Sequence, residues 1–217
     1  MNHSIGIIGG ADGPTAVFVS GSPGAPVLGI FFAAVLLLAL LVLFSRRGGK
    51  RLAVCAVGAA VILAADQAVK ALTALTLAQG ETAQLLPPLV RLHRVHNYGA
   101  AWSSFSGARW LLVGVTAAGL CFLAWLLIRY VRHALGVWSL SCVIAGGAGN
   151  LIDRLARGYV VDMLEFMFFD FPVFNVADIF ITCGCAAALL YYLKFYDKYD
   201  AGRKHGTDRP ASGKRRE

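Results

Sequence analysis

Five long apolar runs constrain the fold of this chain more than any other feature of its sequence. They cover residues 27–44, 52–77, 110–128, 134–152 and 174–193, and each is close to the roughly 20 residues that a helix needs to cross a bilayer. Hydrophobic residues make up 58% of the chain and charged residues 15%, which is too apolar for an average soluble domain. We therefore predict a mostly α-helical integral membrane protein with five transmembrane helices, the first of them optional to the core.

The basic residues indicate how the chain is oriented. Lys and Arg total 20 against 12 Asp and Glu, for a net charge of +8, and fourteen of the basic residues follow the first, third and last apolar runs. These are Arg46, Arg47, Lys50, Arg51, Arg129, Arg132, Lys194, Lys198, Arg203, Lys204, Arg209, Lys214, Arg215 and Arg216. Five crossings place all of them on one side, which the positive-inside rule identifies as the cytoplasm. We expect the N-terminus outside, the C-terminus inside, and no nucleic-acid partner.

Two aspartates stand in otherwise apolar sequence and are the first candidates for chemistry. Asp162 and Asp178 lie sixteen positions apart, joined by the phenylalanine-rich residues 163–174, which should lie against lipid near the outer face. An ionisable side chain at membrane depth is by default a functional hypothesis. Two carboxyls held in a partly desolvated site can share one proton, so that one activates a water while the other donates a hydrogen bond. We predict that the two aspartates form such a pair.

Asp66 and Lys70 are the charged residues of the second apolar run. They lie four positions apart and therefore on one face of a helix. Two interpretations remain open: a buried ion pair near the outer interface, or a lysine that reaches outward to hold a substrate carbonyl or a lipid headgroup.

A second polar group follows a glycine-rich stretch that should let a neighbouring helix approach closely. It contains Asn150, Asp153 and Arg154. We expect Asn150 and Arg154, together with Asn175, to orient the aspartates or bind the substrate main chain. Asp153 is interpreted as structural, because the adjacent guanidinium keeps its carboxylate ionised and occupied.

Residues 78–109 form the only long outer segment. Pro87-Pro88 breaks any helix, and residues 89–95 roughly alternate apolar and polar side chains, which predicts a short strand or hairpin. Trp102 and Phe105 follow among small residues and suit a platform at headgroup level. A plain connecting loop is the alternative.

We predict no metal site and no cofactor. His93 and His96 could seed a metal site, but two histidines in an exposed, arginine-bearing loop are more often solvated. All five cysteines fall within the apolar runs, lack the spacing of zinc or redox motifs, and are interpreted as small buried residues. They are Cys55, Cys121, Cys142, Cys183 and Cys185.

Five short motifs resemble, in their order, those of the lipoprotein signal peptidases, the type II signal peptidases of bacteria. They are Asp66-Gln67-Ala68-Val69-Lys70, Asn97-Tyr98-Gly99-Ala100-Ala101-Trp102-Ser103, Gly149-Asn150-Leu151-Ile152-Asp153-Arg154, Val160-Val161-Asp162 and Phe174-Asn175-Val176-Ala177-Asp178. The resemblance spans about residues 52–195. It implies a four-helix aspartic peptidase of the bacterial cell membrane, without a cofactor, that cuts prolipoproteins on the amino side of a diacylglyceryl-modified cysteine.

The resemblance also implies roles for single residues. The catalytic aspartates fall on Asp162 and Asp178, and residues 78–109 supply a small extracytoplasmic β-sheet. The polar residues implied to line the site are Asp66, Lys70, Asn97, Asn150, Arg154 and Asn175. The expected partners are the lipid-modified prolipoprotein and membrane lipid, and the expected state is a monomer.

Residues 1–51 depart from the family pattern. Within them, residues 6–19 resemble a short motif of sodium-translocating decarboxylase β subunits, in which the counterpart of Asp12 is associated with sodium. We interpret residues 1–51 as an extension with one extra transmembrane helix, residues 52–195 as the peptidase domain, and residues 196–217 as a disordered basic cytoplasmic tail. An ion-translocating or regulatory subunit, and a non-catalytic scaffold, are the alternative functions.

Overall fold

The computed structural model describes residues 5–7, 17–19, 49–100, 104–105 and 107–199, and every structural statement below concerns these residues. Within them, four helices are long and apolar enough to cross a membrane. They are α2 (Gly49–Thr76), α3 (Arg109–Tyr130), α4 (Ala134–Ala156) and α5 (Val176–Lys194), and the short helix α6 (Tyr196–Tyr199) follows. Four of the five predicted apolar helices are thereby confirmed to within a few residues. The fifth, at residues 27–44, lies outside the described part, as do Asp12, Trp102 and residues 200–217.

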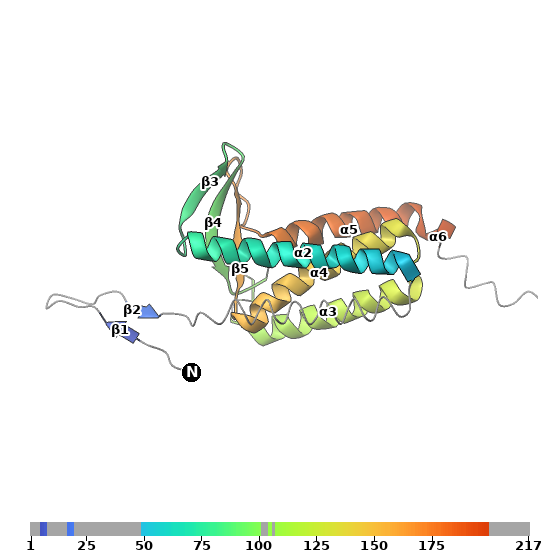
Figure 1. The fold of residues 1–217 in the computed structure, drawn as a ribbon, viewed down its shortest axis with the longest axis horizontal. Helices are drawn as coiled ribbons and strands as arrows, with labels where there is room; N and C mark the ends of the chain where they lie inside the picture. The colour runs from blue at the N-terminus through green and yellow to red at the C-terminus, as the bar shows by residue number, and fades with distance from the viewer. Residues whose placement is uncertain (1–4, 8–16, 20–48, 101–103, 106, 200–217) are drawn as a thin grey trace, which may run out of the picture.

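The four long helices lie side by side, with α4 packed against the other three (Figure 1). Two glycines of α4 show how closely its neighbours approach. A Cβ atom on Gly146 would lie 2.5 Å from the backbone oxygen of Ala177 on α5, and one on Gly149 would lie 2.5 Å from Asp66 Oδ2 on α2. Real Cβ atoms do not tolerate such contacts, so the predicted packing role of these glycines is confirmed. Helix α3 is more peripheral, and Leu127 is its only fully buried residue.

A three-stranded antiparallel sheet covers one end of the bundle, and its strands run across the helix axes (Figure 1). Its order is β3 (Thr82–Leu86), β4 (Val90–Asn97) and β5 (Val160–Phe166). The hairpin predicted within residues 78–109 is confirmed by the pairing of β3 with β4. Strand β5 differs from the prediction, which placed residues 163–174 in a connection lying against lipid and expected no strand at residues 160–166. The strand exists because β4, more than sixty positions earlier, offers it a partner, with Val95 opposite Asp162.

Two arginines tie this end of the molecule together. Arg94 of β4 donates from Nη1 to the backbone oxygens of Ala74 (3.1 Å) and Leu77 (2.7 Å), at the end of α2. Arg109 of α3 donates to the backbone oxygens of Arg154 (2.7 Å) and Leu155 (2.8 Å), in the last turn of α4. The last carbonyls of a helix lack partners within the helix and carry partial negative charge, which favours guanidinium donors. The sheet and α3 are thereby fixed to the helix ends.

The described residues also include a short pair of strands near the N-terminus. Strands β1 (Ile5–Ile7) and β2 (Val17–Val19) pair antiparallel, with Ile5 opposite Val19.

The expectation that all five cysteines are buried is wrong. Cys55 is buried and Cys142 partly so, whereas Cys121, Cys183 and Cys185 are exposed, because each helix of so small a bundle turns one face outward.

Candidate active site

The first turn of α5 holds Asp178 in place through a reciprocal cap. Asn175, the N-cap residue, accepts at Oδ1 from the backbone N–H of Asp178 (3.1 Å), and Asp178 accepts at Oδ2 from the backbone N–H of Asn175 (3.1 Å). This is a capping box, which satisfies two backbone donors at the helix start. A carboxylate in this position is also favoured by the helix dipole. The local sequence therefore fixes the direction of the Asp178 side chain.

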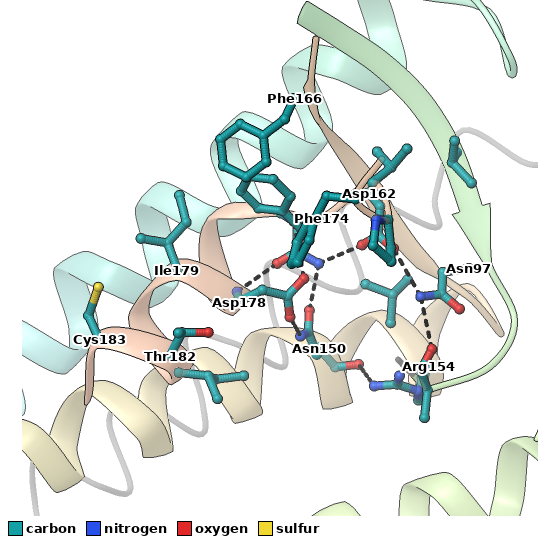
Figure 2. A pocket seen from close by; sticks show the side chains of 18 residues that line it. Asn97, Asn150, Arg154, Asp162, Phe166, Phe174, Asp178, Ile179, Thr182 and Cys183 are labelled. Carbon is teal, nitrogen blue, oxygen red and sulfur yellow. Dashed lines mark hydrogen bonds between the residues drawn. The ribbon is translucent and has the colours of Figure 1, made fainter. Parts of the chain in front are cut away.

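Asp162 reaches the same place from β5. Its side chain accepts hydrogen bonds from Asn175 Nδ2 at Oδ1 (2.7 Å) and from Asn97 Nδ2 at Oδ2 (3.0 Å). The residue is only 3% exposed. Asn175 thus contacts both aspartates, with its backbone and side-chain amides engaged on different carboxylates (Figure 2).

Asn150 of α4 supplies the remaining donor. Its Nδ2 lies 2.8 Å from Asp178 Oδ1, so all four carboxylate oxygens of Asp162 and Asp178 accept one N–H group each. Two aspartates from different elements are held rigidly by asparagines, and the oxygen lone pairs that remain can face the cavity. Groups far apart in sequence are brought together by β5 and the start of α5.

A cavity of about 720 Å³ opens beside these groups. One side of its lining is polar and includes Asn97, Asn150, Arg154, Asp162, Asn175 and Asp178. Another part of the lining is apolar and includes Val95, Phe166, Phe171, Phe174, Ile179, Ile181 and Cys183; Figure 2 labels Phe166, Phe174, Ile179 and Cys183 of these. The apolar wall was missed from the sequence. The only signal for part of it is the alternation of Val160, Asp162 and Phe166, which places these residues on one face of a strand.

Arg154 borders the cavity and anchors the loop that follows β4. Its Nη2 donates to the backbone oxygen of Gly99 (2.8 Å) and its Nη1 to that of Asn150 (3.3 Å). The guanidinium therefore lies beside the aspartates and positions backbone at the cavity rim.

Asp66 and Lys70 do not line the cavity. Both are 0% exposed, and Lys70 Nζ lies 2.8 Å from Asp66 Oδ2 and 3.0 Å from Asp153 Oδ2. The buried ion pair is confirmed and the outward-reaching lysine is wrong. Asp153 has a structural position as expected, but its second partner is Arg157, at 2.9 Å. Arg157 lies one turn after Asp153 on the same helix face, whereas the adjacent Arg154 points elsewhere.

Burial changes the proton affinity of Asp162. Loss of solvent raises its pKa from 3.8 to about 6, and the nearby charge of Asp178 acts in the same direction. The hydrogen bonds from Asn175 and Asn97 oppose this rise, because they stabilise the ionised form. Asp162 therefore changes protonation state close to neutral pH, as acid–base chemistry requires.

The two histidines of β4 have protein partners and are not simply solvated. His93 Nδ1 lies 2.8 Å from Glu165 Oε2. His96 stacks on Tyr159 with ring centroids 3.9 Å apart, and burial, helped by Arg94 and Arg157, lowers its pKa to about 4. Among the residues that the structure describes, no group of three or more His, Cys, Asp or Glu side chains could hold a metal ion.

Comparisons with known proteins agree on one family. The family model described as "Signal peptidase (SPase) II" matches residues 58–194. The lipoprotein signal peptidase of Enterococcus faecalis is 36% identical over 152 residues, which cover 69% of this chain and 92% of that protein. The lipoprotein signal peptidase of Lactococcus lactis subsp. cremoris is 39% identical over 120 residues, which cover 55% of this chain and 80% of that protein. A solved structure described as a bacterial membrane enzyme aligns with a TM-score of 0.63 at 28% identity, covering 72% of this chain and 94% of that one.

Proposed function

This chain belongs to the signal peptidase II family, and on that premise we propose that it is an aspartic endopeptidase that removes signal peptides from lipid-modified bacterial prolipoproteins. The observation that carries this proposal is the position of Asp162 and Asp178 in one cavity, with Asn175 bonded to both. The relatives named lipoprotein signal peptidase support the substrate class. The protein is a multi-pass membrane protein, so the substrate meets it within the bilayer.

In the proposed reaction Asp178 acts as the base and Asp162 as the acid. An oxygen of Asp178 takes a proton from a water, whose oxygen adds to the carbonyl carbon of the scissile peptide. Asp162, the carboxyl with the raised pKa, donates a hydrogen bond to the carbonyl oxygen and stabilises the charge that develops there. When the C–N bond breaks, the leaving nitrogen takes up the proton that Asp178 received from the water. One water is added and two peptides are released.

The apolar wall supports cleavage beside a lipidated residue. Phe166, Phe171 and Phe174 line the same cavity as the aspartates, and the lining continues along α5 to Cys183. A diacylglyceryl group needs such an apolar surface close to the scissile bond. With the lipid chains against this wall, the bond on the amino side of the modified cysteine lies at the aspartates. Asn97 and Arg154 at the rim are placed to bind the substrate main chain.

We assign the sheet and the aspartates to the extracytoplasmic face of the cell membrane. Arg129 and Lys194 lie in the last turns of α3 and α5, and Arg132 lies in the connection from α3 to α4, at the end of the bundle away from the sheet. The positive-inside rule places such residues in the cytoplasm. Residues 52–195 then constitute the peptidase domain, residues 1–51 an extension with one further membrane helix, and residues 196–217 a cytoplasmic tail. We propose that the active state is a monomer.

The direct test uses the purified protein in detergent micelles. It is incubated with a synthetic prolipoprotein peptide that carries diacylglyceryl on its cysteine, and the products are identified by mass spectrometry. We expect a product that begins with the lipidated cysteine, and no cleavage of the same peptide without lipid. Failure to cleave the lipidated peptide, or cleavage at another bond, would overturn the proposed function.

A further inference from the structure

Lys70 is a buried cation that does not line the cavity, and a single side chain separates it from an aspartate of the site. Its ammonium contacts three side chains: Asp66, Asp153 and, at 2.9 Å, Asn150 Oδ1. Asn150 in turn donates to Asp178. A continuous path of two hydrogen bonds therefore runs from the buried cation to a carboxylate of the cavity.

The chemistry of the two ends fixes the direction of the amide between them. A lysine ammonium can only donate hydrogen bonds, and an ionised carboxylate can only accept them. Asn150 must therefore turn its oxygen toward Lys70 and its nitrogen toward Asp178. The reversed amide would place an N–H group against the ammonium and an oxygen against the carboxylate.

A second donor acts on the same oxygen but cannot replace Lys70. Asn175 Nδ2 donates one N–H group to Asn150 Oδ1 at 3.1 Å and the other to Asp162 over 2.7 Å, so this bond to Asn150 is longer than that of Lys70 and lacks its charge. Without Lys70, Asn150 keeps one longer bond and gains empty space behind it. Its side chain can then turn away from Asp178.

The ammonium itself is held by a balanced set of charges. Asp66 and Asp153 flank Lys70, and Arg157 pairs with the other oxygen of Asp153. Two buried carboxylates thus face two cations, which leaves the cluster without net charge and keeps the ammonium in place. Gln67 belongs to the same cluster, through contacts to Asp66 (3.2 Å) and to the backbone oxygen of Gly149 (3.3 Å).

We propose that Lys70 is a positioning residue, which orients the Asn150 amide and through it holds Asp178 in the geometry that activates water. This inference rests on the proposed peptidase function. It assigns Lys70 an effect on turnover that passes through Asn150 and does not involve substrate binding.

The test is a double-mutant cycle in the Asp66→Asn protein, in which replacing Lys70 leaves one carboxylate, Asp153, against one cation, Arg157. Lys70→Met alone leaves two buried carboxylates against one cation and endangers folding, so Lys70 is replaced in the Asp66→Asn protein, where Asp153 and Arg157 still pair. The oxygen of the new amide can still accept from the backbone N–H of Ala177, as Asp66 does at 2.9 Å. Four proteins are compared: Asp66→Asn alone, and with Lys70→Met, with Asn150→Ala, and with both. kcat and KM are measured on the lipidated peptide, and thermal unfolding is measured in detergent.

We expect Lys70→Met to lower kcat about tenfold when Asn150 is present, which is within the coupling range of contacting residues. In the Asn150→Ala proteins the same replacement should leave kcat nearly unchanged. KM should stay constant throughout. As a matched control, Gln67→Met disturbs the same buried cluster without touching Asn150, and its effect on kcat should be the same with or without Asn150→Ala.

Equal losses of kcat from Lys70→Met in both backgrounds would overturn the positioning role, as would a loss confined to KM or to thermal stability. The wild-type protein is assayed beside the four variants, and its failure to cleave would instead refute the proposed function, so the two failures are distinguishable.

Discussion

Asn175, the N-cap of α5, donates a 2.7 Å hydrogen bond from Nδ2 to Asp162 Oδ1 on β5. The same side chain accepts at Oδ1 from the backbone N–H of Asp178. One asparagine therefore begins a helix and joins the two candidate catalytic carboxyls, and these two roles are separable by mutation.

Asn175→Ser should keep the helix and slow the reaction. Serine is as good an N-cap residue as asparagine, but its side chain is too short to reach Asp162. We expect thermal stability close to wild type and a kcat lowered by about tenfold or more, in the range of a positioned hydrogen bond at an acid–base centre. Asn175→Ala removes both functions and should also cost about 1 kcal/mol of stability. Wild-type turnover by Asn175→Ser would contradict the role of this bond.

Asp162→Asn and Asp178→Asn should each abolish prolipoprotein processing. Removing one acid–base group typically lowers the rate by about 10²- to 10⁴-fold, and the amides keep the size of the carboxyls, so both variants should remain in the membrane at normal levels. Asp170→Asn is the matched control, because Asp170 lies exposed in the connection between these two residues. Mature lipoprotein formed by either active-site variant in cells would refute the aspartic mechanism.

The raised pKa of Asp162 predicts the pH dependence of activity. As the proposed acid, Asp162 must be protonated, and its pKa of about 6 means that kcat/KM should fall as the pH rises from 6 to 8. A pH–rate profile on the lipidated peptide measures this fall. A profile that still rises across this range would exclude Asp162 as the acid.

The same shift predicts a change in stability with the opposite sign to the usual carboxylate. The pKa of Asp162 is higher in the folded protein than its ordinary value of 3.8, so the folded state binds the proton more tightly. Its contribution to stability is complete below pH 3.8 and is lost as the pH rises to about 6. Asp162→Asn removes this loss. The melting temperature of the variant relative to wild type should therefore rise between pH 4 and about pH 7.

Removal of residues 1–48 should leave cleavage intact. The family match covers residues 58–194 and every cavity residue lies between Val95 and Cys183. The truncated protein is compared with the full chain on the lipidated peptide, in sodium and in potassium buffer. Equal rates in all four measurements are expected. Sodium-dependent cleavage that disappears on truncation, or with Asp12→Asn, would instead favour an ion-linked role for the extension.

Gly149→Ala should destabilise the protein where α4 packs against Asp66 of α2. The added Cβ would lie 2.5 Å from Asp66 Oδ2, and overpacking of this kind costs about 1–3 kcal/mol. Gly114→Ala in α3 is the matched control, because no atom lies within 4 Å of the added Cβ. It should be neutral or stabilising, since alanine is the better helix former. Melting temperatures in detergent separate the two variants, and equal stability would show that α2 and α4 can shift apart.

The helices were predictable because their signals are local. An apolar run of bilayer length specifies a membrane helix without reference to the rest of the chain. The start of α5 is also local: Asn175 and Asp178 cap the helix through atoms three residues apart. The predicted orientation of the chain across the membrane is also based on a local signal, the basic residues that directly follow particular helices. The motif order around Asp162 and Asp178 indicated the family before any contact was known.

The sequence by itself therefore determined a helical membrane protein, its family and the polar residues of its cavity, which are Asn97, Asn150, Arg154, Asp162, Asn175 and Asp178. Only the tertiary structure decided that β5 pairs with β4, that Lys70 lies behind Asn150, that Asp153 pairs with Arg157, and that Phe166 and Phe171 wall the cavity. These arrangements join groups tens of residues apart. Strand pairing and buried ion pairs gain their free energy from such distant partners, so no stretch of sequence specifies them alone.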